Sequence, residues 1–125
     1  MSYEIYKIIH IFGVIAVFMS LASMALHTMN GGTKENNRYR KLLAAVHGTG
    51  LLVIMIGGMG LGARLGALQG GFAPWIHVKI AIWVVVGPLM MIPYRFPQFA
   101  LGLWIGVPCL GALATWVVQY KTLFL

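Results

Sequence analysis

The chain has 125 residues, of which 60% are hydrophobic and only 9% are charged. Soluble domains carry about 25% charged residues, so this composition excludes an ordinary water-soluble enzyme, and it is too apolar for a disordered chain. The net charge of +7 does not indicate a nucleic-acid partner, because the basic residues stand in short gaps between long apolar runs. The single cysteine, Cys109, excludes an internal disulfide and a cysteine-ligated metal cluster. We therefore expect an integral membrane protein.

Four apolar stretches predict four membrane-spanning helices. About 20 helical residues, at ~1.5 Å each, cross the ~30 Å hydrocarbon core of a bilayer. The expected spans are residues 3–29, 39–61, 75–94 and 98–120. Asn and Gly mark the first connection, and the second is rich in Gly and ends at Pro74, which suits the first turn of a helix. Such short connections favour an all-α, up-down-up-down four-helix bundle that forms one domain, residues 1–125.

The basic residues predict an orientation. The densest basic group follows the first span and consists of Lys34, Arg38, Arg40 and Lys41. By the positive-inside rule this loop is expected in the cytoplasm and both termini outside, as in a protein of the bacterial inner membrane. Glycines spaced four apart, at positions 58, 62, 66 and 70 and at 102 and 106, predict close helix packing, within the bundle or in a homo-oligomer.

Four histidines are the main functional signal. Ionisable residues inside a membrane are functional candidates by default, and a neutral imidazole offers a lone pair to a metal. His10 and His27 are 17 residues apart in one span, which is about 25 Å along a helix. The alternation of span directions pairs His10 with His77 near the termini, and His27 with His47 near the first loop. Each pair could ligate iron, so we expect one or two haem b groups.

Residues beside these histidines fit the same cofactor. Gly13 and Gly50 each follow a histidine by three positions, so each could leave a bare patch against which a porphyrin edge rests. Lys7 precedes His10 by about one turn, and Arg38 lies at the other boundary, so both could neutralise haem propionates. Lys79 could neutralise a propionate or a substrate carboxylate, or extend its stem to the interface. Lys79 and His77 are two positions apart, and they should therefore face nearly opposite directions.

The alternatives remain open. Instead of ligands, His10 could be a hydrogen-bonded core residue, His27 an interfacial residue that caps its helix, and His77 a boundary ring beside Trp75. Copper is the rival metal, because eight methionines supply soft ligands suited to copper(I), although methionine also fills apolar cores. A non-catalytic subunit that assembles with another membrane protein is the third class. The leading expectation is a haem protein that transfers electrons, or a membrane oxidoreductase, with a quinone or a porphyrin-like molecule as substrate.

Two short motifs also resemble a known group of proteins. The run Lys7-Ile8-Ile9-His10-Ile11 and the segment Pro74-Trp75-Ile76-His77-Val78-Lys79 resemble compact membrane proteins related to HemJ-type protoporphyrinogen oxidase and CopD-type copper-resistance proteins. The resemblance covers about residues 3 to 95. It implies a helical membrane bundle, and it implies that His10 and Lys79 are the haem-binding or activity residues.

Overall fold

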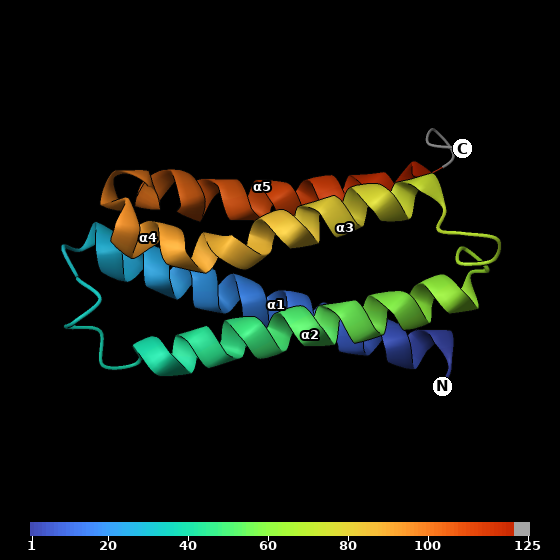
Figure 1. The fold of residues 1–125 in the computed structure, drawn as a ribbon, viewed down its shortest axis with the longest axis horizontal. Coiled ribbons are helices and arrows are strands. Elements are labelled where there is room, and N and C mark those ends of the chain that lie inside the picture. Colours follow the sequence, from blue (N-terminus) through green and yellow to red (C-terminus); the bar gives the residue numbers. More distant parts are fainter. Residues whose placement is uncertain (122–125) are drawn as a thin grey trace.

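The computed structural model describes residues 1–121, all of whose regular elements are helical. The long helices are α1 (Tyr3–Met29), α2 (Arg40–Arg64), α3 (Pro74–Val86) and α5 (Ala100–Gln119). Three short elements join α3 to α5: the 3₁₀ helix η1 (Gly87–Met91), α4 (Ile92–Arg95) and the 3₁₀ helix η2 (Pro97–Phe99). The helices run up-down-up-down, and the N-terminus lies at the same end of the bundle as the end of α5 (Figure 1). The predicted all-α four-helix bundle is confirmed.

Four segments are long and apolar enough to cross a membrane. They are Tyr3–Met29, Arg40–Arg64, Pro74–Arg95 and Pro97–Gln119, with mean hydropathies between 1.8 and 2.2. The second helix continues to Arg64, three residues beyond its predicted end at residue 61. The protein is therefore an integral membrane protein, and the outward-facing side chains of its helices contact lipid.

The third span, predicted as a single helix over residues 75–94, is not one regular helix. The α-helix ends at Val86, and a 3₁₀ segment and the short α4 complete the crossing. Pro88 and Pro93 explain the change, because a proline has no N–H and its ring clashes with the carbonyl four residues earlier. The break alters the pattern of backbone hydrogen bonds in the middle of the third span.

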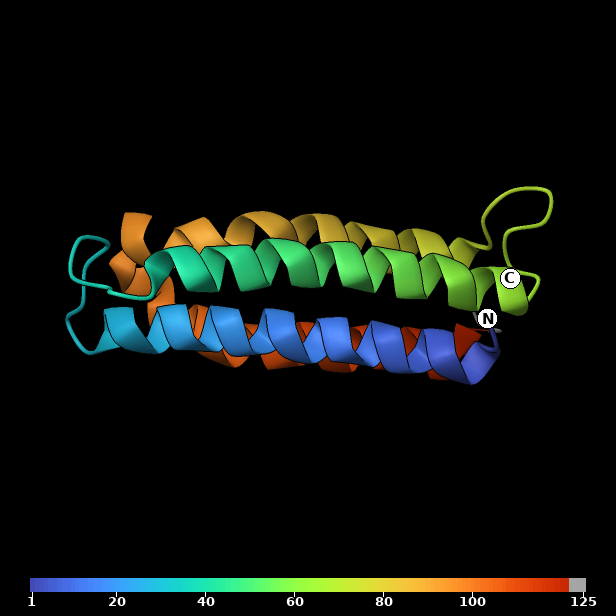
Figure 2. The ribbon, with the colours of Figure 1, turned by 90° about the horizontal axis from the view of Figure 1, so that it is seen from below.

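α1 lies beside α2 and α5, α3 lies beside α5, and α2 contacts the third span at η1 (Figures 1 and 2). A buried cluster joins α1, α3 and α5 and consists of Val17, Leu21, Ala25, Val86, Leu103 and Val107. A second cluster, nearer the termini, consists of Trp75, Ile76 and Val117. The core is thus divided between two layers along the bundle.

Glycines bring α1 and α2 into close contact. A Cβ atom added to Gly13 would lie 2.8 Å from the backbone nitrogen of Ile54 and 2.9 Å from the carbonyl oxygen of Gly50. A Cβ added to Gly50 would lie 2.8 Å from a methyl carbon of Val17. The facing helix therefore covers both glycines. Contrary to our expectation, Gly13 and Gly50 do not leave a bare surface for a porphyrin edge.

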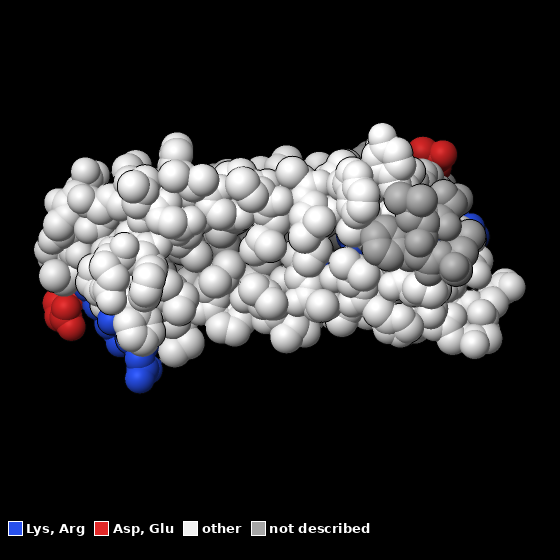
Figure 3. All heavy atoms as spheres, turned by 90° about the horizontal axis from the view of Figure 1, so that it is seen from above, with Lys and Arg blue, Asp and Glu red and all other residues white. Residues whose placement is uncertain are grey.

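The outer surface matches a bilayer. Large apolar side chains on α1 are exposed, among them Ile8, Phe12 and Met19 at 67%, 67% and 63%. On the face shown in Figure 3, acidic side chains are visible only at the two ends of the bundle, and basic side chains are visible at the ends and in one small area between the middle and the right-hand end. Apolar side chains in the middle of the bundle suit the hydrocarbon core of a bilayer, and charged side chains at its ends suit the headgroup layers.

Candidate functional site

A cavity of about 720 Å³ lies between the four helices, in the half of the bundle nearer the termini. Side chains of α1, α2, α3 and α5 all contribute to its wall, which is mostly apolar. Its polar or charged lining residues are Tyr3, Lys7, His10, Lys79, Trp83, Thr115, Gln119 and Lys121. We call this space the central cavity.

His10 is held against the central cavity by the backbone of α2. Its Nδ1 lies 2.9 Å from the carbonyl oxygen of Ile54. A carbonyl oxygen only accepts, so Nδ1 carries a proton, and in the neutral form of the ring Nε2 then carries the lone pair. Two glycines make room for this arrangement: a Cβ on Gly57 would lie 2.6 Å from the backbone nitrogen of His10, and one on Gly58 would lie 3.3 Å from its ring. The contact therefore fixes the orientation of the His10 ring and, when the ring is neutral, its tautomer.

Three lysines give the central cavity a positive charge. Lys7 comes from α1, Lys79 from α3, and Lys121 follows α5. Lys121 also places its Nζ 5.7 Å from the centre of the Trp75 ring. No carboxylate is among the described residues that line the cavity. The combination of an apolar wall and unneutralised ammonium groups suits an apolar ligand that carries acidic groups at one end.

His77 lies apart from this group. Its side chain is exposed, and its ring centre lies 6.2 Å from that of Phe72. Lys79 lines the central cavity while His77 does not, as the two-residue spacing predicted. His10 is therefore the only histidine among the described residues of the cavity wall, and the expected partnership of His10 with His77 is not formed there.

His47 is buried, with 4% of its surface exposed, and it joins α2 to η1. Its Nε2 lies 2.9 Å from the carbonyl oxygen of Gly87, so Nε2 donates and Nδ1 carries the lone pair. That Nδ1 is buried and has no hydrogen-bond partner. The residue both ties two helices together and retains an unused acceptor, although it does not line the central cavity.

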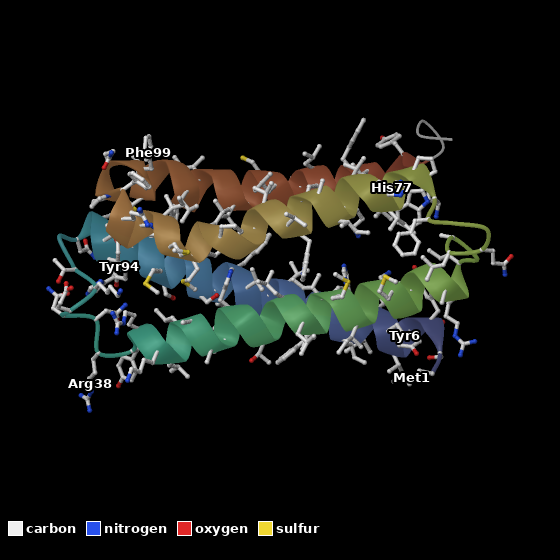
Figure 4. The ribbon with its side chains drawn as sticks, in the orientation of Figure 1. Met1, Tyr6, Arg38, His77, Tyr94 and Phe99 are labelled. Atoms are coloured by element: carbon white, nitrogen blue, oxygen red, sulfur yellow. The ribbon has the colours of Figure 1, made fainter. Side chains whose placement is uncertain are left out.

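His27 belongs to a polar network at the opposite end of the bundle. The Tyr94 hydroxyl lies 2.7 Å from Nδ1 of His27, and it accepts a hydrogen bond of 2.6 Å from Nδ2 of Asn37. Figure 4 shows Tyr94 at the end where the first loop lies and His77 near the other end. The expected partnership of His27 with His47 is replaced by separate contacts, to Tyr94 and to Gly87. Arg38 is exposed, with its guanidinium 5.7 Å from the centre of the Tyr39 ring.

Tyr94 and Asn37 were not among the predicted site residues. Tyr94 is the last residue of the predicted third span, and Asn37 lies in the connection between the first two predicted spans. Their sequence separation of 57 residues hides the contact, since only the packing of α4 against α1 and the first loop brings them together. The sequence held one signal for this contact: Asn37 lies just before the second span and Tyr94 at the end of the third, and these two boundaries are expected at the same end of the bundle.

Within residues 1–121, no group of three or more His, Cys, Asp or Glu side chains is placed to hold a metal ion. A metal held by protein side chains alone would therefore need other donors, whereas a haem needs only one or two. No protein-family model matches the sequence. No curated protein and no solved structure is significantly similar to it. The fold and the cavity define the class: a four-helix integral membrane protein with a cavity between its helices that three lysines line.

Proposed function

We propose that this protein binds haem b in the central cavity, where His10 would hold the iron through its imidazole, and that it serves electron transfer or redox chemistry in the membrane. The observation that carries the proposal is the 2.9 Å contact between Nδ1 of His10 and the carbonyl oxygen of Ile54. An Nδ1–H group that donates to a backbone carbonyl orients the ring, increases its basicity and leaves Nε2 for iron.

The surroundings of His10 support the same ligand. A volume of about 720 Å³ falls within the roughly 300–1,000 Å³ of small-molecule sites. Apolar walls suit a porphyrin face, and Lys7, Lys79 and Lys121 suit two propionates. The resemblance to HemJ-type proteins implies that His10 and Lys79 are haem-binding or activity residues, and both line the central cavity.

The chain's own residues would control the chemistry. A bound haem supplies one-electron transfer, and its potential depends on its ligands and on burial. Ile54 would hold the His10 ring in place through its carbonyl oxygen, while the apolar residues of the wall would keep water out. A quinone or a porphyrin-like molecule is the proposed redox partner, since both are apolar enough to approach from lipid.

A spectrum of the purified protein tests the proposal. Protein made in haem-replete cells and purified in detergent should show sharp reduced-minus-oxidised haem bands. His10→Ala should lose them, whereas the matched variant His77→Ala should retain them, because His77 is exposed and outside the cavity. A colourless parent protein, or equal loss in the two variants, would refute the assignment.

Copper(I) is the second candidate, because Met55 and Met59 line the same cavity as His10. They stand four residues apart on α2 and therefore share a face, and thioether sulfur suits copper(I). Metal analysis decides between the candidates. Copper in excess of iron, lost in Met55→Leu/Met59→Leu but kept in the exposed control Met19→Leu, would favour copper.

A further inference from the structure

A second hollow, of about 800 Å³, lies at the first-loop end of the bundle, away from the central cavity. Residues of the first loop, the start of α2 and the η1–α4 region line it. Four of its lining residues are basic: Lys34, Arg40, Lys41 and Arg95. We call this space the loop hollow.

The positive charge of the loop hollow is not balanced by the protein. Its only carboxylate is Glu35, against four cations, which leaves an excess of three positive charges among the described lining residues. Within residues 1–121, no ion pair joins Glu35 to any of these bases. The N-terminus of α2 adds to the positive potential, because Tyr39 provides no side-chain hydrogen bond to its free N–H groups. An anionic ligand would supply the missing charge.

The other wall of the loop hollow is apolar. Met24, Met90 and Met91 line it, and Met24 is almost fully buried at 2% exposure. The hollow therefore offers cations and thioether side chains together. A ligand that fits both has an acidic group joined to an apolar portion.

The position of the loop hollow along the bundle further restricts the chemical class of its ligand. α1 ends at Met29 and α2 begins at Arg40, so the hollow lies where the membrane-spanning helices end. Lipid headgroups occupy this level, and basic side chains next to a membrane span attract acidic lipids. Guanidinium groups bind phosphate oxygens in pairs, and ammonium groups add charge without fixed geometry.

We infer that the loop hollow binds the phosphate headgroup of an anionic phospholipid. Arg40 and Arg95 approach the phosphate from α2 and α4, while Lys34 and Lys41 neutralise the remaining charge. The methionine wall contacts the glycerol and the first methylene groups of the acyl chains. This site is independent of haem in the central cavity.

Binding of phosphatidylglycerol tests the inference. The detergent-purified full chain is titrated with phosphatidylglycerol or with phosphatidylcholine of the same acyl chains, and bound lipid is counted by native mass spectrometry. Phosphatidylglycerol should bind and phosphatidylcholine should not. Arg40→Gln/Arg95→Gln should bind phosphatidylglycerol about tenfold or more weakly, since charged hydrogen bonds are lost. Arg38→Gln/Arg64→Gln, which removes two exposed arginines outside both the loop hollow and the central cavity, should leave binding unchanged.

Three outcomes would overturn the inference. Equal binding of the two lipids would show that the headgroup charge is not recognised. Equal weakening by both double variants would show a general attraction to positive charge. If millimolar inorganic phosphate displaces the lipid from the parent protein and raises its melting temperature by itself, the ligand is free phosphate and the phospholipid is excluded. Circular dichroism of each variant confirms that it is folded before binding is compared.

Discussion

Nδ1 of His10 lies 2.9 Å from the carbonyl oxygen of Ile54, and this contact joins α1 to α2 inside the membrane. It is made possible by Gly57 and Gly58, whose missing side chains leave room for the backbone and ring of His10. The same contact determines which nitrogen of the imidazole is free. The packing of two helices and the chemistry of the candidate site therefore depend on the same few atoms.

The first prediction concerns Gly57. In Gly57→Ala the new methyl group would lie 2.6 Å from the backbone nitrogen of His10, so α1 and α2 must separate. We expect the free energy of unfolding to fall by about 1–3 kcal/mol, the usual cost of overpacking. Thermal unfolding in detergent measures it.

Gly48→Ala is the matched control, because a Cβ there meets no atom within 4 Å. Alanine favours a helix by about 0.5–1 kcal/mol over glycine, so this variant should be as stable as the parent or slightly more stable. Equal melting temperatures for the two variants would contradict the proposed close approach.

The second prediction concerns His47. In His47→Leu the Gly87 carbonyl loses its side-chain donor, and we expect a loss of about 1–3 kcal/mol from an unsatisfied buried group. His77→Leu changes an exposed ring and should alter stability by no more than about 0.5 kcal/mol. Denaturation curves of both variants give the comparison. No difference between them would show that the Gly87 contact does not stabilise the fold.

The third prediction concerns the hydroxyl of Tyr94. Tyr94→Phe leaves His27 Nδ1 and Asn37 Nδ2 without the oxygen that joins them. The first loop should then open more readily, and amide hydrogens of residues 30–39 should exchange several-fold faster. If the closed form of the loop loses about 1.4 kcal/mol of stability, the exchange rate of these amides rises about tenfold. Tyr39→Phe, in the same loop, should leave exchange unchanged, and faster exchange in that variant alone would contradict the network.

The fourth prediction concerns Lys79 and depends on the proposed haem. Lys79→Gln removes a half-buried ammonium group from the central cavity, so haem should be released roughly tenfold faster. Transfer of haem to apomyoglobin measures the rate. Arg64→Gln, whose side chain is exposed outside the cavity, should match the parent protein. Release at the parent rate from Lys79→Gln would show that Lys79 does not hold a propionate.

Much of the architecture was predictable because the bilayer imposes simple requirements. Backbone groups must be paired within each span, and about 20 apolar residues are needed to cross. These requirements predicted the first helix at residues 3–29, where the structure has it, and the other three to within three residues. The break at Gly87 was also readable in principle, since Pro88 and Pro93 stand in the third span.

The candidate site was only partly predictable. His10 and Lys79 were named from the sequence, and the structure places both in one cavity. The histidines were paired with one another by their depth in the membrane, but in the structure His10, His47 and His27 contact Ile54, Gly87 and Tyr94 instead. Depth along an axis follows from residue counting, but the direction in which a side chain points depends on how each helix is rotated in the bundle.

The sequence by itself determined that the chain crosses a membrane four times, because hydropathy and span length are properties of consecutive residues. Only the tertiary structure decided that Gly13 and Gly50 pack against the facing helix, and that His10 donates to Ile54. It also decided that Tyr94 joins His27 to Asn37. The physical reason is that contacts between two helices depend on how each helix is rotated and how far apart the two lie. Small side chains on both helices determine that separation together.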